Sequence, residues 1–233
     1  MLKYAAMNNT DKPKRDPRVF EYSVGQEVSH AITHGIGAAL GVAALVLMIV
    51  FAARAETGVA WKVVGASLFG ATIILLYLTS TLYHALFHEK AKVVFEIFDH
   101  QAIYLLIAGS YTPFALVTLR EYSPWIGWTV FGVIWGLAVL GIVFKVFTTG
   151  KFKIISTLMY IGMGWVAIFT LKPLIASLPA AGLAWLGIGG LLYTAGTVFC
   201  LWRRLSISHS IWHMFVLAGT ICHFFCVFFH VIR

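Results

Sequence analysis

The sequence predicts an all-α protein, a bundle of seven transmembrane helices. Of its 233 residues, 60% are hydrophobic and 11% are charged, whereas a soluble domain carries about 25% charged residues. Seven runs without a charged residue each hold roughly 18 residues or more, which is enough for a helix to cross the hydrocarbon core. Membrane strands would show alternating polar and apolar residues, and this alternation is missing.

The charge-free runs give the expected helices in order: 35–53, 63–88, 101–119, 122–144, 154–171, 173–202 and 205–232. The first contains Gly35, Gly37 and Gly41, a spacing of small residues that favours close helix packing. Run 173–202 is longer than one crossing needs. Pro173 and the stretch Pro179-Ala-Ala-Gly182 are typical of a loop, so we expect its helix to begin near Ala181.

Two regions are expected: a basic cytoplasmic arm at residues 1–20 and a single membrane domain at residues 21–233. The arm has basic residues from Lys3 to Arg18 but lacks the apolar core and cleavage site of a signal peptide. The net charge of +8 would suit a nucleic-acid partner. The membrane surface gives a simpler account of it, so no nucleic-acid partner is expected.

The distribution of Lys and Arg predicts a cytoplasmic N-terminus and a C-terminus outside. With the N-terminus inside, 12 of the 17 Lys and Arg lie at cytoplasmic helix ends and 5 at outer ends. Without the arm the division is still 7 against 5. Cytoplasmic loops are enriched in these residues.

This orientation places polar and ionisable side chains of several helices at one membrane depth, although burying such groups in a membrane is energetically unfavourable. We expect Ser80 and His84 in the last turns of the second helix, and His209 and His213 in the first two turns of the seventh. Asp99 is expected in the first turn of the third helix. Ionisable groups inside a membrane are rare and usually functional.

The spacing at this depth suits a metal. Residues four apart lie on one helix face, so His209 and His213 together with His84 can supply three imidazoles to Zn²⁺. A zinc ion with three protein ligands keeps a water, whose pKa falls to about 7. Asp99 would orient that water and accept its proton. Ser80 would donate a hydrogen bond to Asp99, the water or a substrate carbonyl. The predicted chemistry is attack on a lipid amide or ester.

Ordinary explanations exist for single residues. A histidine at a helix end is commonly an interfacial residue, and we assign His88 and His100 to this class. Asp99 could instead cap the third helix. Glu27 could be a first-turn acid that complements the helix dipole or a group that supports the metal ligands.

Four further histidines remain open at this point. His30 and His34 lie on the first helix near Glu27; they could help to close the metal site, and we favour a supporting or structural role for this group. His223 and His230 lie about 21 and 31 Å beyond His209 along the last helix, too far to share its metal. They extend a histidine stripe on that helix, which is the basis for an alternative function as a proton or ion path.

The motifs also resemble a known family, the hemolysin III-type branch of the progestin and adipoQ receptor (PAQR) superfamily. A more distant similarity is to the adiponectin receptors and alkaline ceramidases. The resemblance spans residues 27 to 213, and its motifs in chain order are Glu27 with Thr33-His34-Gly35, Ser80-Thr-Leu-Tyr-His84, Asp99-His100 with Gly109-Ser110-Tyr111-Thr112-Pro113, and His209-Ser-Ile-Trp-His213.

The resemblance implies a cytoplasmic N-terminus, zinc on His84, His209 and His213, and an acidic residue at Asp99 that holds the zinc-bound water. It also implies a serine role for Ser80. One departure is visible, because His30 stands where the family pattern usually has Asn.

The resemblance further implies a multi-pass protein of the bacterial cytoplasmic (inner) membrane. Eukaryotic relatives are associated with ceramide hydrolysis and membrane fluidity, and the bacterial branch with haemolysis and membrane homeostasis. We therefore expect a zinc-dependent hydrolase of a membrane lipid amide or ester that serves lipid and fluidity homeostasis. The alternatives are a non-enzymatic receptor or sensor stabilised by zinc, with the lipid as ligand, and an ion or proton channel-like protein with hemolysin III activity.

Overall fold

The computed structural model describes residues 22–149, 151–202 and 205–233, so the predicted basic arm at residues 1–20 lies outside the described residues. Within those ranges every regular element is helical, and seven helical spans are long and apolar enough to cross a membrane. This confirms the all-α fold class. The elements are α1 (Val24–Ala53), α2 (Val59–Ala85), α3 (Glu89–Pro113), η1 (Phe114–Leu119), α4 (Arg120–Tyr122), α5 (Pro124–Thr148), α6 (Lys153–Gly164), η2 (Trp165–Thr170), α7 (Leu171–Ser177), α8 (Ala180–Leu201), α9 (Ser208–Val227) and η3 (Phe228–Ile232).

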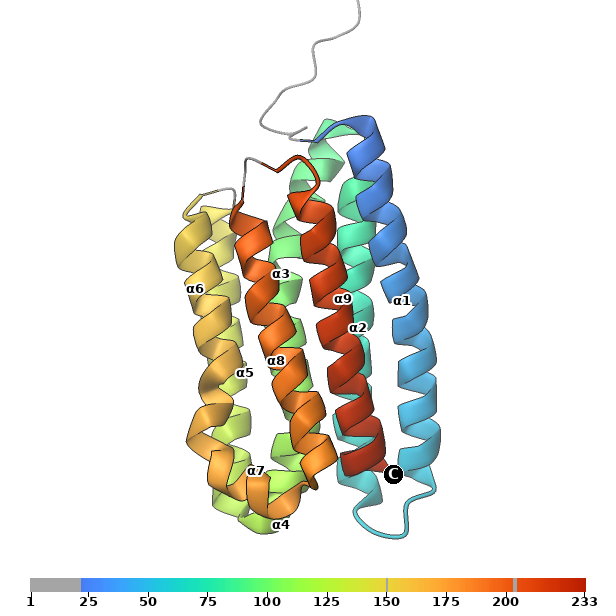
Figure 1. Cartoon of the computed structure of the whole chain (residues 1–233), viewed down its shortest axis with the longest axis vertical. Coiled ribbons are helices and arrows are strands. Elements are labelled where there is room, and N and C mark those ends of the chain that lie inside the picture. Colours follow the sequence, from blue (N-terminus) through green and yellow to red (C-terminus); the bar gives the residue numbers. More distant parts are fainter. Residues whose placement is uncertain (1–21, 150, 203–204) are drawn as a thin grey trace, which may run out of the picture.

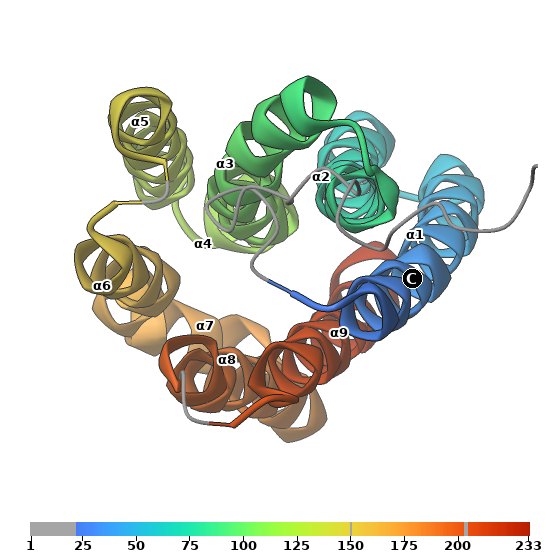
Figure 2. The same cartoon turned by 90° about the horizontal axis from the view of Figure 1, so that it is seen from above.

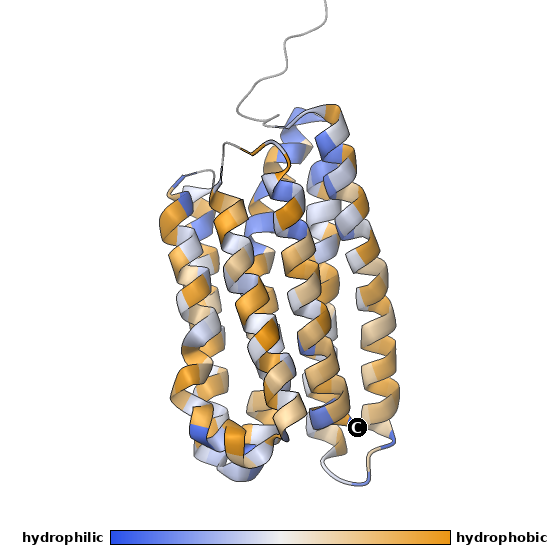
Figure 3. Ribbon diagram, in the orientation of Figure 1, coloured by the Kyte–Doolittle hydropathy of each residue, from blue (hydrophilic) through white to orange (hydrophobic). Residues whose placement is uncertain are grey.

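The spans stand side by side and form a ring in which the last helix returns to the first (Figures 1 and 2). The helices α1, α2, α3 and α5 follow one another around the ring, and α6, α8 and α9 complete it. Hydrophilic residues gather at the end of the bundle where α1 begins and at the connections of the opposite end (Figure 3). Large apolar side chains such as Ile32, Leu140 and Phe169 are exposed on the outside, as expected of a surface in contact with lipid.

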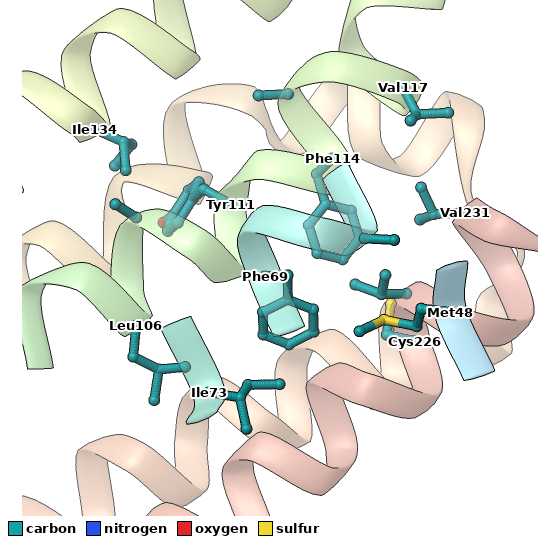
Figure 4. Close-up of a cluster of buried hydrophobic side chains, with 14 of the residues drawn as sticks. Met48, Phe69, Ile73, Leu106, Tyr111, Phe114, Val117, Ile134, Cys226 and Val231 are labelled. Atoms are coloured by element: carbon teal, nitrogen blue, oxygen red, sulfur yellow. The ribbon is translucent and has the colours of Figure 1, made fainter. Parts of the chain in front are cut away.

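A cluster of buried apolar side chains joins α1, α2 and η1. Figure 4 shows Met48 of α1, Phe69 and Ile73 of α2 and Phe114 of η1 in one cluster. Glycines allow these helices to approach closely. A Cβ added at Gly37 would lie 2.5 Å from the ring of Tyr77, which confirms the close packing predicted for this part of the first helix.

Two predicted boundaries are wrong. The third helix begins at Glu89 rather than near Asp99, because charged residues end an apolar run but do not end a helix. Asp99 therefore lies about ten residues, or roughly 15 Å, inside α3, and the alternative that it caps this helix is wrong, since His88 is the N-cap. Pro173 is helical in α7 rather than part of a loop, at an early position where proline is tolerated. The predicted start near Ala181 agrees with Ala180.

In the fifth span, Lys153–Ser177, the 3-10 turn η2 interrupts the α-helix. Tyr111 of α3 provides hydrogen-bond partners for backbone groups at this interruption. The Tyr111 hydroxyl donates to the carbonyl oxygen of Gly164 (2.6 Å) and accepts from the backbone N–H of Ala167 (2.8 Å). Backbone polar groups at membrane depth must find partners within the protein. Tyr111 thus fixes α6 and η2 against α3, beside the cavities described below.

Candidate metal centre

Five histidines from three helices gather at the end of the bundle where α1 begins: His30, His34, His84, His209 and His213. As predicted, α2 contributes its last turn and α9 its first turns. Among the described residues, His30, His84 and His209 have ligand atoms that all lie within 4.8 Å of one another. This group could hold a metal ion.

The imidazole nitrogens at the centre of the cluster lack protein partners. Both ring nitrogens of His30, Nε2 of His84 and Nε2 of His209 are buried without a hydrogen bond. An unpaired buried polar atom costs about 1–3 kcal/mol, so several at one place need a common explanation. Neutral imidazole nitrogens are ligands for Zn²⁺, and a bound metal would satisfy them together.

Glu27 of α1 orients His84. Its Oε2 lies 2.6 Å from Nδ1 of His84, and its Oε1 lies 2.8 Å from the ammonium of Lys92. Because the carboxylate accepts the Nδ1 proton, Nε2 of His84 is left as a free lone pair directed to the cluster. A carboxylate behind a histidine is the usual support of a metal ligand. The structure thus supports the interpretation of Glu27 as a supporting group, since its carboxylate contacts two side chains of other helices.

Lys92 is an unexpected member of this group. Its ammonium also donates to the backbone oxygen of Tyr83 (2.9 Å) and lies 4.5 Å from the centre of the Tyr83 ring. Glu27 and Lys92 are each 1% exposed. They form a buried ion pair that joins α1, α2 and α3, and sequence spacing alone does not reveal a pair between distant helices.

Replacing Glu27 with alanine is expected to lower the free energy of unfolding by about 3–5 kcal/mol, because Lys92 would remain buried without its counter-charge. Denaturant titration of the detergent-solubilised protein measures this loss. The matched control, Glu27→Gln with Lys92→Met, removes both charges and should recover most of it. A single variant as stable as wild type would show that the ion pair contributes nothing.

His213 packs directly against the three clustered rings, with centroid distances of 4.5 to 5.2 Å. Its ring stacks on His34 with centroids 3.5 Å apart, and its Nδ1 lies 3.2 Å from Oγ1 of Thr33. The Thr33 hydroxyl donates to the backbone oxygens of Ser29 and His30, so it accepts the Nδ1 proton of His213. This leaves Nε2 of His213 unprotonated, as in His84, which is the form that binds a metal.

Asp99 and Ser80 also lie close to the cluster. Asp99 lines a cavity of about 100 Å³ together with His209, Tyr83, Lys145 and Lys153. Ser80 is 1% exposed; its hydroxyl lies near the Asp99 carboxyl and has no hydrogen bond of ordinary geometry. Asp99 thus reaches the cavity from the third turn of α3, and not from the first turn as predicted.

Tyr22 is a residue that sequence reasoning missed. Its ring stacks on His209 and meets the edge of His30, both with centroids 4.9 Å apart. It precedes α1, whose N-cap is Ser23, and it contacts the cluster from the end of the bundle. An aromatic residue five positions before the E-x-x-H motif of α1 was the available signal.

The remaining histidines lie outside this group of five. His88 caps α3 by accepting from the backbone N–H of Ala91 (3.4 Å). His100, which we expected to be an interfacial residue, contacts the backbone oxygen of Glu96 (2.7 Å) and lines the cavity that Asp99 and His209 share. His223 lines cavities deeper in the bundle, and His230 lies near the opposite end beside Gly182. The structure therefore separates the histidine stripe of the last helix into distinct environments.

Comparison with known proteins agrees with the resemblance. The family model described as Haemolysin-III related matches residues 22–224. The chain is 47% identical to the Hemolysin-3 homolog of Bacillus subtilis (strain 168) over 212 residues, which cover 91% of this chain and 97% of the relative. It is 49% identical to the Hemolysin-3 of Bacillus cereus over 209 residues, or 90% and 93% of the two chains.

A more distant similarity extends to a human protein. The chain is 28% identical to the monocyte to macrophage differentiation factor of Homo sapiens over 180 residues, which cover 74% of this chain and 73% of the relative. With the seven apolar helices, these matches confirm a multi-pass membrane protein and agree with the predicted bacterial inner membrane.

Proposed function

This chain belongs to the Haemolysin-III related family, and we propose that it is a zinc-dependent hydrolase of a lipid amide or ester that serves membrane homeostasis. The observation that carries the proposal is the convergence of unpartnered imidazole nitrogens from α1, α2 and α9 beside a cavity that Asp99 lines. Glu27 and Thr33 hold two of the imidazoles in the metal-binding tautomer.

In this proposal His84, His209 and His213 hold the zinc. Supported by Glu27 and Thr33, His84 and His213 offer Nε2, and His209 contributes a buried Nε2 of its own. The ring centroid of His213 lies 4.5 Å from that of His209 and 5.2 Å from that of His84. His30, whose ligand atom lies within 4.8 Å of those of His84 and His209, would border the fourth position, which is left to water.

A zinc ion with three imidazole ligands supplies a water that ionises near neutral pH. Asp99 would hold this water and accept its proton, because it lines the cavity that His209 borders. Ser80 would donate a hydrogen bond to Asp99 or to the substrate carbonyl. The lysines of the same cavity, Lys145 and Lys153, place positive charge where the polar part of a lipid would enter.

The cavities below the cluster suit a lipid chain. The polar cavity of Asp99 shares Ile103, Tyr160 and Trp212 with a deeper one of about 100 Å³, which adjoins a third of about 340 Å³. Leucine, isoleucine and aromatic side chains dominate the lining of the deeper two. An acyl chain in these cavities would bring its amide or ester carbonyl near the histidine cluster.

The proposal keeps the cytoplasmic N-terminus inferred from the distribution of Lys and Arg. All the site residues lie at the end of the bundle where α1 begins, so this orientation places the site on the cytoplasmic side. A substrate would then come from the inner leaflet of the cytoplasmic membrane.

The hydrogen bonds around the Thr220 hydroxyl disfavour a proton path along α9. The hydroxyls of Tyr77 and Tyr193 each lie 2.8 Å from Oγ1 of Thr220, and Thr220 donates its proton to the backbone oxygen of Val216. Both tyrosines therefore donate into the same oxygen. A proton cannot pass between them unless the bond from Thr220 to Val216 breaks first.

Replacing His30 with asparagine, the residue usual in the family pattern, is expected to leave about one zinc per chain. Replacing His213 with asparagine should remove most of it. X-ray absorption at the zinc edge should count three imidazoles in both wild type and His30→Asn. Four imidazoles would instead leave no coordination position for water. Four protein ligands are typical of structural zinc, and this result would favour the receptor or sensor alternative.

A further inference from the structure

His223 occupies a position that the proposed reaction does not use. The two deeper cavities, of about 100 and 340 Å³, lie between α3, α6 with η2, α8 and α9, and His223 of α9 borders both. The cavities also share Ser110, Tyr111, Gly164, Trp165 and Gly190. His223 lies about 21 Å from His209 along α9, well away from the proposed metal.

Most other polar side chains of these cavities are engaged with the protein. The hydroxyls of Ser110, Tyr111, Thr194 and Thr197 donate to backbone carbonyls, and the Trp165 indole N–H donates to the Thr194 hydroxyl. A ligand finds few free polar atoms here, and His223 supplies one of them.

One ring nitrogen of His223 is held by the protein and the other is not. Nε2 lies 3.3 Å from the backbone oxygen of Leu186, so Nε2 carries the proton and Nδ1 of the neutral ring is an acceptor. Nδ1 is buried without a hydrogen bond, and the residue is 8% exposed. A bond across helices is a sufficient role for Nε2, but it leaves Nδ1 unexplained.

The His223 ring is fixed in place by its neighbours. The ring of Tyr193 meets it edge-on at 5.3 Å. A Cβ added at Gly189 would lie 2.6 Å from Nε2 of His223, so the absence of a side chain at this position makes room for the ring. Because the acceptor is already held in place, little conformational entropy of the side chain is lost when a donor binds to it.

We propose that Nδ1 of His223 is a subsite for a hydroxyl group carried partway along a lipid acyl chain that lies in these cavities. A hydroxyl is the neutral donor that an acyl chain can carry, and Nδ1 requires a donor. The inference deepens the proposed function by naming a hydroxylated chain as the preferred lipid class. It rests on the proposed function only for which end of the lipid lies near the histidine cluster. Binding of the hydroxyl group itself requires no hydrolysis.

Displacement of a fluorescent fatty acid from the purified full-length protein tests the subsite. The competitors are stearate and 12-hydroxystearate, which contain no amide or ester, so a failure of the hydrolase proposal leaves this measurement intact. Wild type should bind the hydroxylated chain about tenfold more tightly, the effect of one net hydrogen bond of about 1.4 kcal/mol. His223→Leu should bind both chains equally, with an affinity for stearate close to that of wild type.

The control is His230→Leu, the same change on the same span outside these two cavities. It should keep the preference of wild type. A series of stearates with the hydroxyl at different carbons provides a second test that needs no variant. Affinity should peak at one position. Equal binding across the series, or an undiminished preference in His223→Leu, would overturn the subsite.

Discussion

Replacing His209 and His213 together with alanine is expected to reduce bound zinc from about one ion per chain to nearly none. Both residues lie in the first turns of α9 and face His84 within the cluster. Removing two of three proposed ligands leaves a single imidazole, which cannot retain zinc against dilution. Mass spectrometry of the metal content of purified protein measures the ratio directly.

The matched control for this double variant is His230→Ala, a histidine at the far end of the same span. It should retain zinc at the wild-type level. Loss of zinc should also lower the melting temperature of the double variant, because a ligand that binds only the folded protein stabilises it. An unchanged zinc content in the double variant would show that the metal binds elsewhere.

Replacing Asp99 with asparagine is expected to reduce lipid hydrolysis by about 100- to 10,000-fold while zinc remains bound. A positioned general base contributes about this much to a rate, and an amide cannot accept the proton of the attacking water. The substitution preserves the shape of the side chain in the cavity that it shares with His209. Turnover and metal content are measured on the same preparation.

Glu96→Gln is the control for Asp99→Asn, because Glu96 is an acidic residue of the same helix and the same cavity. Its turnover should stay within a few-fold of wild type. If Asp99→Asn lost its zinc together with its activity, Asp99 would be a structural residue of the site. If turnover were unchanged, another group would accept the proton.

Much of the fold follows from apolar length alone. Seven charge-free runs lie within or overlap the seven spans, and the helix expected to begin near Ala181 begins at Ala180, after a proline. The start of α3 was not predictable in this way. Its first turns carry charges beyond the apolar part, so Asp99 lies deeper within α3 than its place at the edge of an apolar run indicates.

The sequence predicts which residues share one membrane depth, but it does not predict which side chains contact one another at that depth. The ends of α2 and α9 meet as the crossing order requires, which brings His84, His209 and His213 together. The group of ligand atoms within 4.8 Å of one another, however, contains His30 with His84 and His209, and not His213. Which imidazole faces the centre depends on helix rotation, and so does the Glu27–Lys92 pair. A sequence pattern fixes neither rotation nor partner.

The most direct test of the central claim is the release of free fatty acid from vesicles that contain ceramide and phosphatidylglycerol, measured with one protein preparation in three states. The states are purified wild type with about one zinc per chain, the same protein after chelation, and the chelated protein reloaded with zinc. We expect release in the first state, loss in the second and recovery in the third. Protein with zinc bound that releases no more fatty acid than empty vesicles, yet melts at a lower temperature after chelation, would contradict the central claim and make the zinc structural.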